Sequence, residues 1–277
     1  MGTLSSARAA GPPLFEGLRR SSRAAAFDFV RAVSRVQPIA DGARWAPVAL
    51  ACGALPLVAA WATGVDFHRP ATALLMLPVW LYLVRRDREA AACGMVFLTF
   101  AIHSVVAMAL VSIDAAGADR VLLDGPAYWT KNIRWIRTGL DPEYELVNWV
   151  PAHVQDAAGM ALYGVSSLGF VPLVRGLYQI DLMNCYVGHL LALSRSGAIA
   201  LFVGWHVWSI LRGVAYTRLC FAASSHGLEW MTGLTLSTPA RRRRRWLVAA
   251  GLLAVDGLLK WLLLEPVRQV LSKNLIS

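Results

Sequence analysis

The chain has 277 residues, of which 57% are hydrophobic and only 16% are charged, and its mean hydropathy is +0.50. Soluble domains carry about 25% charged residues, so this composition argues against a soluble globular protein. The net charge of +10 is typical of basic loops on one side of a membrane, and we therefore expect no nucleic-acid partner.

Residues 1–45 form a basic arm that precedes the first apolar run. Within the arm, residues 24–36 place Phe29, Val33 and Val36 on one face of a possible helix, while the arginines of this segment fall on the other side. Two interpretations stay open. The arm either lies as an amphipathic helix on an anionic leaflet or is a solvated extension.

Seven apolar runs follow the arm, and each predicts a membrane-spanning helix. A span needs about 20 apolar residues, and an unpaired backbone amide in lipid costs several kcal/mol, so runs of this kind are helical. We therefore predict an all-α, polytopic transmembrane helix bundle of about seven spans, with six possible if 157–193 is a re-entrant pair. The runs are 46–64, 70–84, 90–113, 157–174, 177–193, 197–216 and 246–264.

The charge distribution divides the chain into four parts and orients it. Arginine clusters at 85–88 and 241–245 should lie on the cytoplasmic side, together with the N-terminus, because basic loops stay inside. Acidic residues outnumber basic ones in the intervening loop, which suits the opposite side. The parts are the cytoplasmic arm 1–45, the first three transmembrane helices 46–113, the non-cytoplasmic loop 114–156 and the C-terminal transmembrane bundle 157–277.

Residues 127–140, in the non-cytoplasmic loop, have the spacing of an amphipathic helix. Apolar and aromatic side chains follow one stripe that continues to Leu140, whereas Lys131 lies on the opposite, polar side. We expect the helix to lie flat on the outer membrane surface, with aromatic rings in the head-group layer. Alternatives are a lid over the span ends, a docking surface or a substrate gate. The residues expected at this interface are Trp129, Ile133, Arg134, Trp135, Ile136 and Arg137.

Two apolar runs contain ionisable residues at membrane depth, where each charge costs about 2.5–3.5 kcal/mol on insertion scales. Asp256 and Lys260 are four residues apart on one helix face, so we expect them to neutralise each other. The alternative is a proton or ion relay. Asp181 and Asn184 share another face, with His189 beside them. Interhelical hydrogen bonding is the favoured interpretation of that group, and an intramembrane site is the alternative.

Metal and cofactor sites are not expected from the sequence. The four cysteines are far apart, and no CxxC motif or close Cys/His spacing occurs, so we predict no metal site. His206 is a further histidine placed at membrane depth. A haem between His189 and His206 is one alternative, because histidines on adjacent helices can ligate haem iron.

Three functions are compatible with this reading. The leading hypothesis is a non-enzymatic structural or accessory subunit of a larger membrane complex, whose partners are membrane lipids and other membrane-protein subunits. The alternative is a small-solute, ion or lipid transporter or channel, lined by the intramembrane polar residues Asp181, Asn184, His206, Asp256 and Lys260.

The third hypothesis is a membrane-embedded lipid-modifying enzyme. It would use Glu145, His153 and Asp156 at the outer head-group level, with the histidine and aspartate acting as an acid–base pair. We favour a non-enzyme because the sequence contains no coherent reactive constellation. The 24 arginines against 3 lysines suggest a GC-rich bacterial gene, and hence a multi-pass protein of the bacterial inner membrane.

Overall fold

A computed structural model of the protein describes residues 45–140 and 146–276. Within these ranges the chain is all-helical, with ten helices and no β-sheet, which confirms the predicted all-α class. Apart from Trp45, the predicted basic arm and its segment 24–36 lie outside the described residues, as does Glu145.

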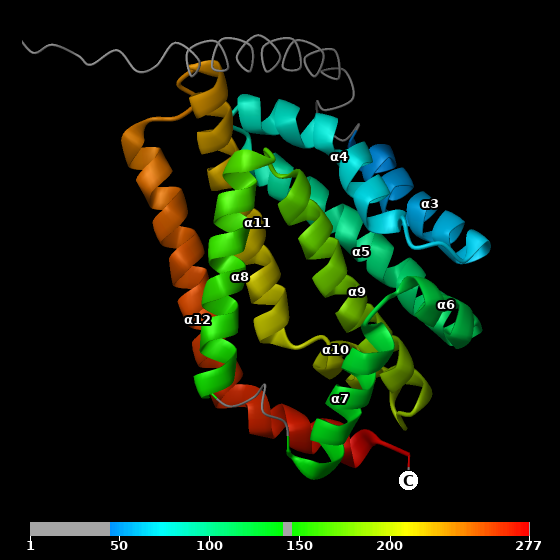
Figure 1. The fold of residues 1–277 in the computed structure, drawn as a ribbon. Helices are drawn as coiled ribbons and strands as arrows, with labels where there is room; N and C mark the ends of the chain where they lie inside the picture. Colours follow the sequence, from blue (N-terminus) through cyan, green and yellow to red (C-terminus); the bar gives the residue numbers. More distant parts are fainter. Residues whose placement is uncertain (1–44, 141–145, 277) are drawn as a thin grey trace, which may run out of the picture.

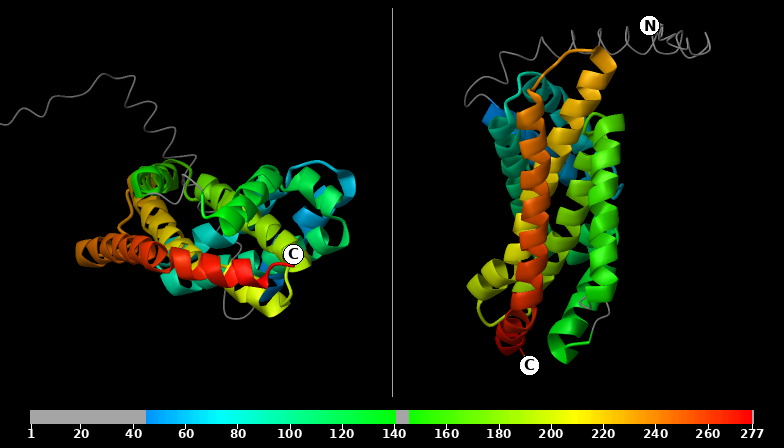
Figure 2. Two further views of the ribbon diagram at one scale, coloured as in Figure 1. Left: turned by 90° about the horizontal axis from the view of Figure 1, so that it is seen from below. Right: turned by 90° about the vertical axis from the view of Figure 1, so that its left-hand side faces the viewer.

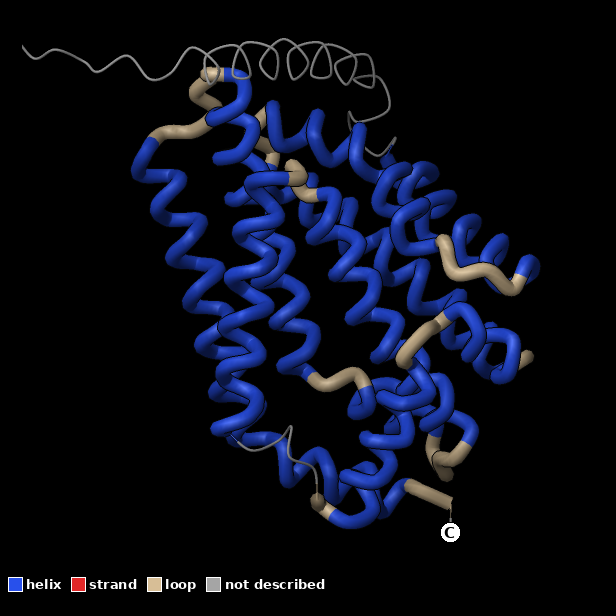
Figure 3. The backbone as a smooth tube through the Cα atoms, viewed as in Figure 1, coloured by secondary structure: helices blue, strands red, loops and turns tan. Residues whose placement is uncertain are grey.

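Long helices packed side by side form the body of the molecule, and the shorter α6, α7 and α10 lie toward one end (Figure 1). Short loops make most of the connections (Figure 3). Figure 2 shows α8 and α12 running along the length of the bundle. The helices are α3 (Trp45–Thr63), α4 (His68–Arg85), α5 (Glu89–Ile113), α6 (Ala115–Val121), α7 (Gly125–Thr138), α8 (Leu146–Ser166), α9 (Phe170–Ala192), α10 (Gly197–Gly204), α11 (Val207–Thr232) and α12 (Pro239–Asn274).

The exterior of the bundle is apolar, while charged and polar groups are enclosed. Leu55 on α3, Val105 on α5 and Trp261 on α12 expose 60% or more of their surface. Asp181 on α9 and Asp256 on α12 expose 1% or less. Water would favour the reverse distribution, because exposing apolar surface and burying charge both cost free energy. This distribution is that of a helix bundle whose outer surface faces lipid.

Among the described residues, three helices are long and apolar enough to cross a membrane: the segments Ala46–Thr63, Glu89–Ile113 and Pro239–Asn274. A fourth candidate is the pair α10 and α11, which together qualify as one span bent by 41°. The predicted seven spans, or six, are therefore not supported. The remaining long helices α4, α8 and α9 are more polar, since they include residues such as Arg69 and Asp156.

The two arginine clusters meet at one end of the bundle, as their predicted common side requires. Arg245 pairs with Asp87 at 2.5 Å and with Glu89 at 2.9 Å, and Arg241 also pairs with Asp87. Arg218 of α11 adds an ion pair with Glu89 at 2.8 Å. These contacts fasten the start of α12 to the turn between α4 and α5.

The predicted helix in the non-cytoplasmic loop is α7, and it packs against α9 and α12. Trp135 and Ile136 expose 1% and 0% of their surface, while Trp129 and Ile133 are partly buried. Leu140 lies beyond the end of the helix and is exposed, so the apolar stripe ends earlier than predicted. The polar residues Arg134 and Arg137 are exposed. The apolar face of α7 thus covers the ends of neighbouring helices, as in the lid alternative.

Candidate functional site

Polar residues gather in two separate regions inside the bundle. The first, which we call the Asp181 cluster, comprises Asp66, His68, Arg69, His103 and Asp181 and lies where α4, α5 and α9 meet. The second is the wall of a large cavity formed mainly by α5, α8, α9, α11 and α12. The sequence placed Asp181 at membrane depth but did not identify either region as a unit.

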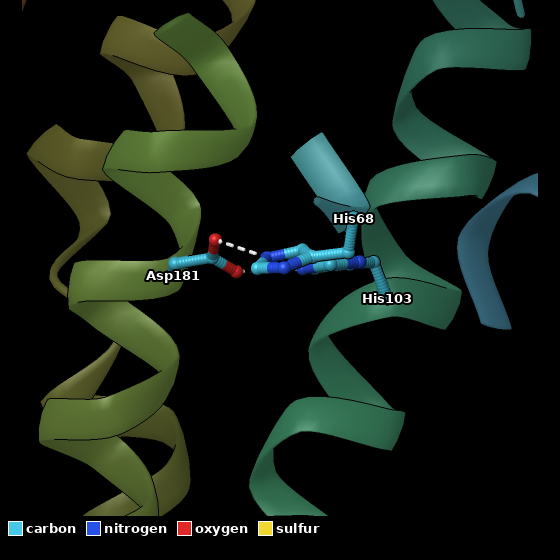
Figure 4. A group of neighbouring side chains, drawn as sticks. All are labelled: His68, His103 and Asp181. Carbon is cyan, nitrogen blue, oxygen red and sulfur yellow. Dashed lines mark hydrogen bonds and ion pairs between the residues drawn. The ribbon is translucent and has the colours of Figure 1, made fainter. Parts of the chain in front are cut away.

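The carboxylate of Asp181 is the centre of the first region, facing His68 and His103 (Figure 4). Its side chain is completely buried. Its Oδ2 accepts a 2.6 Å hydrogen bond from Arg69 Nε and lies 2.8 Å from His68 Nε2. Its Oδ1 lies 2.6 Å from His103 Nε2. Both imidazoles are themselves fully buried. The carboxylate therefore links two helices, α4 and α5, to α9.

Further contacts fix the orientation of the two imidazole rings. The rings of His68 and His103 stack with their centroids 5.6 Å apart and their planes at 18°. On the far side of its ring, His68 Nδ1 lies 3.1 Å from Asp66 Oδ1. Asp66 also pairs with Arg69 at 3.3 Å. Two acidic groups thus lie near the two nitrogens of a single imidazole, and the one beside Nδ1 makes no hydrogen bond to it in the described structure.

Sequence reasoning missed His68 and Arg69. Both belong to the first turn of α4, directly after the α3–α4 connection, where polar residues are usually solvated. Their contact partner Asp181 is 113 and 112 positions away in the sequence. The spacing of residues within one helix cannot predict contacts between positions so far apart. The signal that was available is the run "DFHRP" at 66–70, in which an acid, a histidine and an arginine precede an apolar helix.

The second region is a cavity of about 550 Å³, which is within the usual size range of small-molecule sites. One part of its wall is apolar and aromatic. It comprises Phe97, Phe100, Val105, Met108, Tyr128, Ile180, Leu182, Met183, Trp205, Trp208 and Ile210. The other part is polar and comes from four helices. Its members include His153, Asp156, Arg175, Tyr178, Gln179, His206, Ser209, Arg212 and Lys260.

Asp256 has a partner that the sequence did not identify. Arg212 of α11 approaches its carboxylate with two nitrogens, at 3.0 and 3.2 Å, and the carboxylate is almost fully buried. Lys260, one turn further along α12, lies with its ammonium group 5.0 Å from the centre of the Trp149 ring. Both cationic side chains line the cavity. Asp256 does not line the cavity, and it contacts Arg212 on the side that faces away from the cavity.

The predicted pair His153 and Asp156 also lines the cavity, although no hydrogen bond joins the two side chains in the described structure. His153 Nδ1 lies 2.8 Å from the carbonyl oxygen of Trp149, so it donates to that oxygen. Its buried Nε2 has no hydrogen-bond partner among the described residues. Asp156 instead accepts hydrogen bonds from Arg175 and Gln179, each at 3.1 Å.

The break between α10 and α11 places a helix start at the cavity. His206 occupies the break, exposes 3% of its surface and stacks on Trp208 with the ring centroids 4.5 Å apart. Its Nε2 also has no hydrogen-bond partner in the described part of the chain. His206, Trp208 and Ser209 all line the cavity. A helix N-terminus carries partial positive charge, so this end of α11 favours an anion.

His189 lies elsewhere, at the α6–α9 contact. Its Nε2 is 3.2 Å from Asp119, and its ring stacks on Trp129. His206 lines the cavity and His189 does not, so the haem between them stays a prediction. The fully buried Asn184 makes no side-chain hydrogen bond in the described structure. The interhelical hydrogen bond predicted for it is therefore not present among the described residues.

Comparison with known proteins assigns neither a family nor a function to the chain. No protein-family model matches the sequence, and searches of curated proteins and of solved structures return no significant match. The chemistry of the two polar regions is therefore the basis for any functional interpretation of this helix bundle.

Proposed function

We propose that the protein is a lipid transporter that binds an amphiphile with an anionic head group in the cavity. The observation that carries this proposal is the division of the cavity wall into an aromatic, apolar part and a part with excess positive charge. Three cationic side chains line the cavity, Arg175, Arg212 and Lys260, whereas Asp156 is the single lining carboxylate among the described residues.

The positions of the cationic side chains support an anionic ligand. Arg175, Arg212 and Lys260 bring three cationic groups to one wall, where Asp156 is the single carboxylate among the described lining residues. Cationic side chains attract phosphate and carboxylate groups, and the attraction is stronger where the dielectric is low. The start of α11 lies at the same wall and would favour an anionic head group further.

The apolar part of the wall supports a ligand with a hydrocarbon portion. Phe97 and Phe100 of α5 and Met183 of α9 offer flat or flexible apolar surface to the cavity. Burying hydrocarbon there contributes roughly 25 cal/mol per Å² of apolar area removed from water. A free inorganic anion would use only the polar part, so its binding should be much weaker than that of a lipid.

Ligand binding tests the proposal directly. Native mass spectrometry of the detergent-purified protein would compare phosphatidic acid with phosphatidylcholine, which has no net negative charge. We expect selective retention of phosphatidic acid, and at least a tenfold loss of that retention in the double variant Arg212→Gln, Lys260→Met. A double variant at the exposed Arg243 and Lys273, with Arg243→Gln and Lys273→Met, removes the same charge away from the cavity.

The control variant should change retention by less than twofold. Equal losses in both double variants would indicate lipid attracted by the overall positive charge, and would contradict a site in the cavity. Transport itself is measured in proteoliposomes as movement of a fluorescent anionic lipid between leaflets, relative to protein-free vesicles. Binding without movement would contradict transport and favour the lipid-modifying enzyme, with His153 Nε2 as its base.

The accessory-subunit hypothesis remains the second candidate, and the exposed apolar face of α12 is its specific support. The apolar window of α12 is only 17% buried, with Trp261 and Leu262 exposed. Lipid or another membrane subunit would cover such a face. Affinity purification from the native membrane in mild detergent distinguishes the two, because a subunit would co-elute with a partner in stoichiometric amount.

We also propose that the arginine-rich end of the bundle is cytoplasmic, in a bacterial inner membrane, with α7 at the outer surface. The meeting of the 85–88 and 241–245 clusters at one end supports this orientation. A cysteine introduced by Arg243→Cys should react with a membrane-impermeant maleimide only after cells are lysed. Labelling of intact cells would reverse the orientation.

A further inference from the structure

The donor atoms of the Asp181 cluster have the composition of a transition-metal site. His68, His103 and Asp181 each offer one ligand atom, and these atoms all lie within 4.8 Å of one another. The three residues come from α4, α5 and α9, and all are completely buried. Neutral imidazole nitrogens with one carboxylate oxygen suit zinc, cobalt and related divalent ions.

The geometry is close to what coordination would need. Zinc lies about 2.0–2.2 Å from nitrogen and oxygen ligands, which places the ligand atoms of a tetrahedral site roughly 3.3 Å apart. The Nε2 atoms of His68 and His103 lie 2.8 and 2.6 Å from the oxygens of Asp181. Displacements of about 1 Å or less would therefore admit an ion between the imidazoles and the carboxylate. Figure 4 shows both imidazoles directed at that carboxylate.

Asp66 faces the far side of the His68 ring. Its Oδ1 lies 3.1 Å from His68 Nδ1, and neither atom has a hydrogen-bond partner among the described residues. A small rotation of either side chain would let Asp66 accept the Nδ1 hydrogen, which leaves the Nε2 lone pair for a metal. Arg69 Nε donates to Oδ2 of Asp181, which His68 Nε2 also approaches, so an ion bound through Oδ1 would require His68 Nε2 to shift from Oδ2 towards the ion.

We infer that His68, His103 and Asp181 bind one divalent transition-metal ion of the zinc class, with Asp66 orienting His68. The site is separate from the cavity, because none of the three ligands lines the cavity wall, and it does not depend on the proposed function. Its ligands are sealed from solvent, so the ion would be structural. It would join the paired helices α4 and α5 to α9.

Cobalt titration of the purified, chelator-treated protein is the first test. We expect one equivalent of Co²⁺ to bind with d–d absorption bands, and zinc to displace it. His103→Asn should abolish this binding, and Asp66→Asn should weaken it about 10- to 100-fold, because it removes the carboxylate beside His68 Nδ1. His226→Asn, an exposed histidine on α11, is the matched control and should bind normally.

A second group, formed by Asp119, Cys185 and His189, is the competing location for a metal. It contains a sulfur ligand, and the proposed site contains none. X-ray absorption of the zinc-loaded protein should therefore show nitrogen and oxygen ligands only, a result that needs no variant. A sulfur ligand, or binding lost in His189→Asn and kept in His103→Asn, would overturn the assignment. The absence of stoichiometric Co²⁺ binding would overturn it as well.

Discussion

The Asp181 cluster and the polar wall of the cavity use the same residue types in different ways. In the cluster, one fully buried carboxylate has contacts from two imidazoles and a guanidinium, although the Nδ1 atoms of both imidazoles have no hydrogen-bond partner in the described structure. In the cavity wall, Arg212 and Lys260 face a volume of about 550 Å³, and His153 and His206 keep an unbonded nitrogen.

This difference concerns how closely each polar group is held by other protein groups. The Asp181 carboxylate contacts three side chains from two other helices at 2.6 to 2.8 Å, so losing it should affect the folded state directly. Arg212 and Lys260 instead line a cavity of about 550 Å³, where a bound molecule can contact them. Substitutions in the two regions should therefore have different consequences.

The largest expected effect is on stability, from Asp181→Asn. This change removes the anionic group that Arg69 and both imidazoles contact, and among the described residues Arg69 keeps only its ion pair with Asp66 at 3.3 Å. Breaking a buried pair costs about 3–5 kcal/mol. The free energy of unfolding in mixed detergent micelles measures it. The control Asp156→Asn, at a half-exposed pair with Arg175, should cost about 1 kcal/mol or less. Equal losses would remove the distinction between the regions.

Asp256→Asn should lower the stability of the protein and at the same time strengthen lipid binding. It removes the carboxylate that faces Arg212, and losing a hydrogen bond to a charged group costs about 1.5–3 kcal/mol. The released positive charge should strengthen retention of phosphatidic acid roughly tenfold, equivalent to about 1.4 kcal/mol. Lipid retention by native mass spectrometry, measured beside the unfolding free energy, would show both changes. Weaker lipid retention would count against Arg212 as a head-group contact.

Raising the salt concentration should weaken lipid binding in the cavity, while the contribution of the Asp181 cluster to stability should change less. Raising ionic strength from about 0.1 to 1 M shortens the Debye length from about 10 to 3 Å, and this screens charges that solvent can reach. We expect severalfold weaker binding of an anionic amphiphile, because Arg175 is 47% exposed. The contribution of the sealed Asp181 cluster to stability should not change. A lipid affinity that is independent of salt would place the head group away from these cations.

The smallest effect is expected from Arg241→Ala at the arginine-rich end. Arg241 is 62% exposed and pairs with Asp87, and exposed ion pairs contribute about 0–1 kcal/mol. The free energy of unfolding of this variant measures the effect of removing a charge that lies outside both the Asp181 cluster and the cavity wall. A loss near that of Asp181→Asn would mean that the ends of the bundle are as tightly coupled as its interior.

The sequence predicted the helical class because apolar runs and backbone hydrogen bonding leave little choice in lipid. It also located α7, since the turn residues at Gly125 and Gly139 border an amphipathic segment. The number of spans was overestimated, because α4 and α9 have apolar runs although their buried faces carry Arg69 and Asp181. An apolar run does not reveal whether a helix faces lipid or other helices.

The site was less predictable than the fold, for a physical reason. Asp256 and Lys260 were identified together because they are one turn apart, and Arg212 was missed because it approaches from another helix. His68 was missed in the same way. The spacing of residues in the sequence predicts which side chains are neighbours within one helix. Both polar regions are instead assembled from three or more helices.

The contacts of Asp181 also constrain how the protein is made. Arg69 and Asp181 are 112 positions apart, so at about 5–20 residues per second the partner on α9 is synthesised roughly 6 to 22 s later. Until then, α4 carries a guanidinium and a histidine whose acidic neighbour is Asp66 alone within the cluster. The contact between α4 and α9 at Asp181 can therefore form only after that delay, so the packing of α4 is completed late relative to its synthesis.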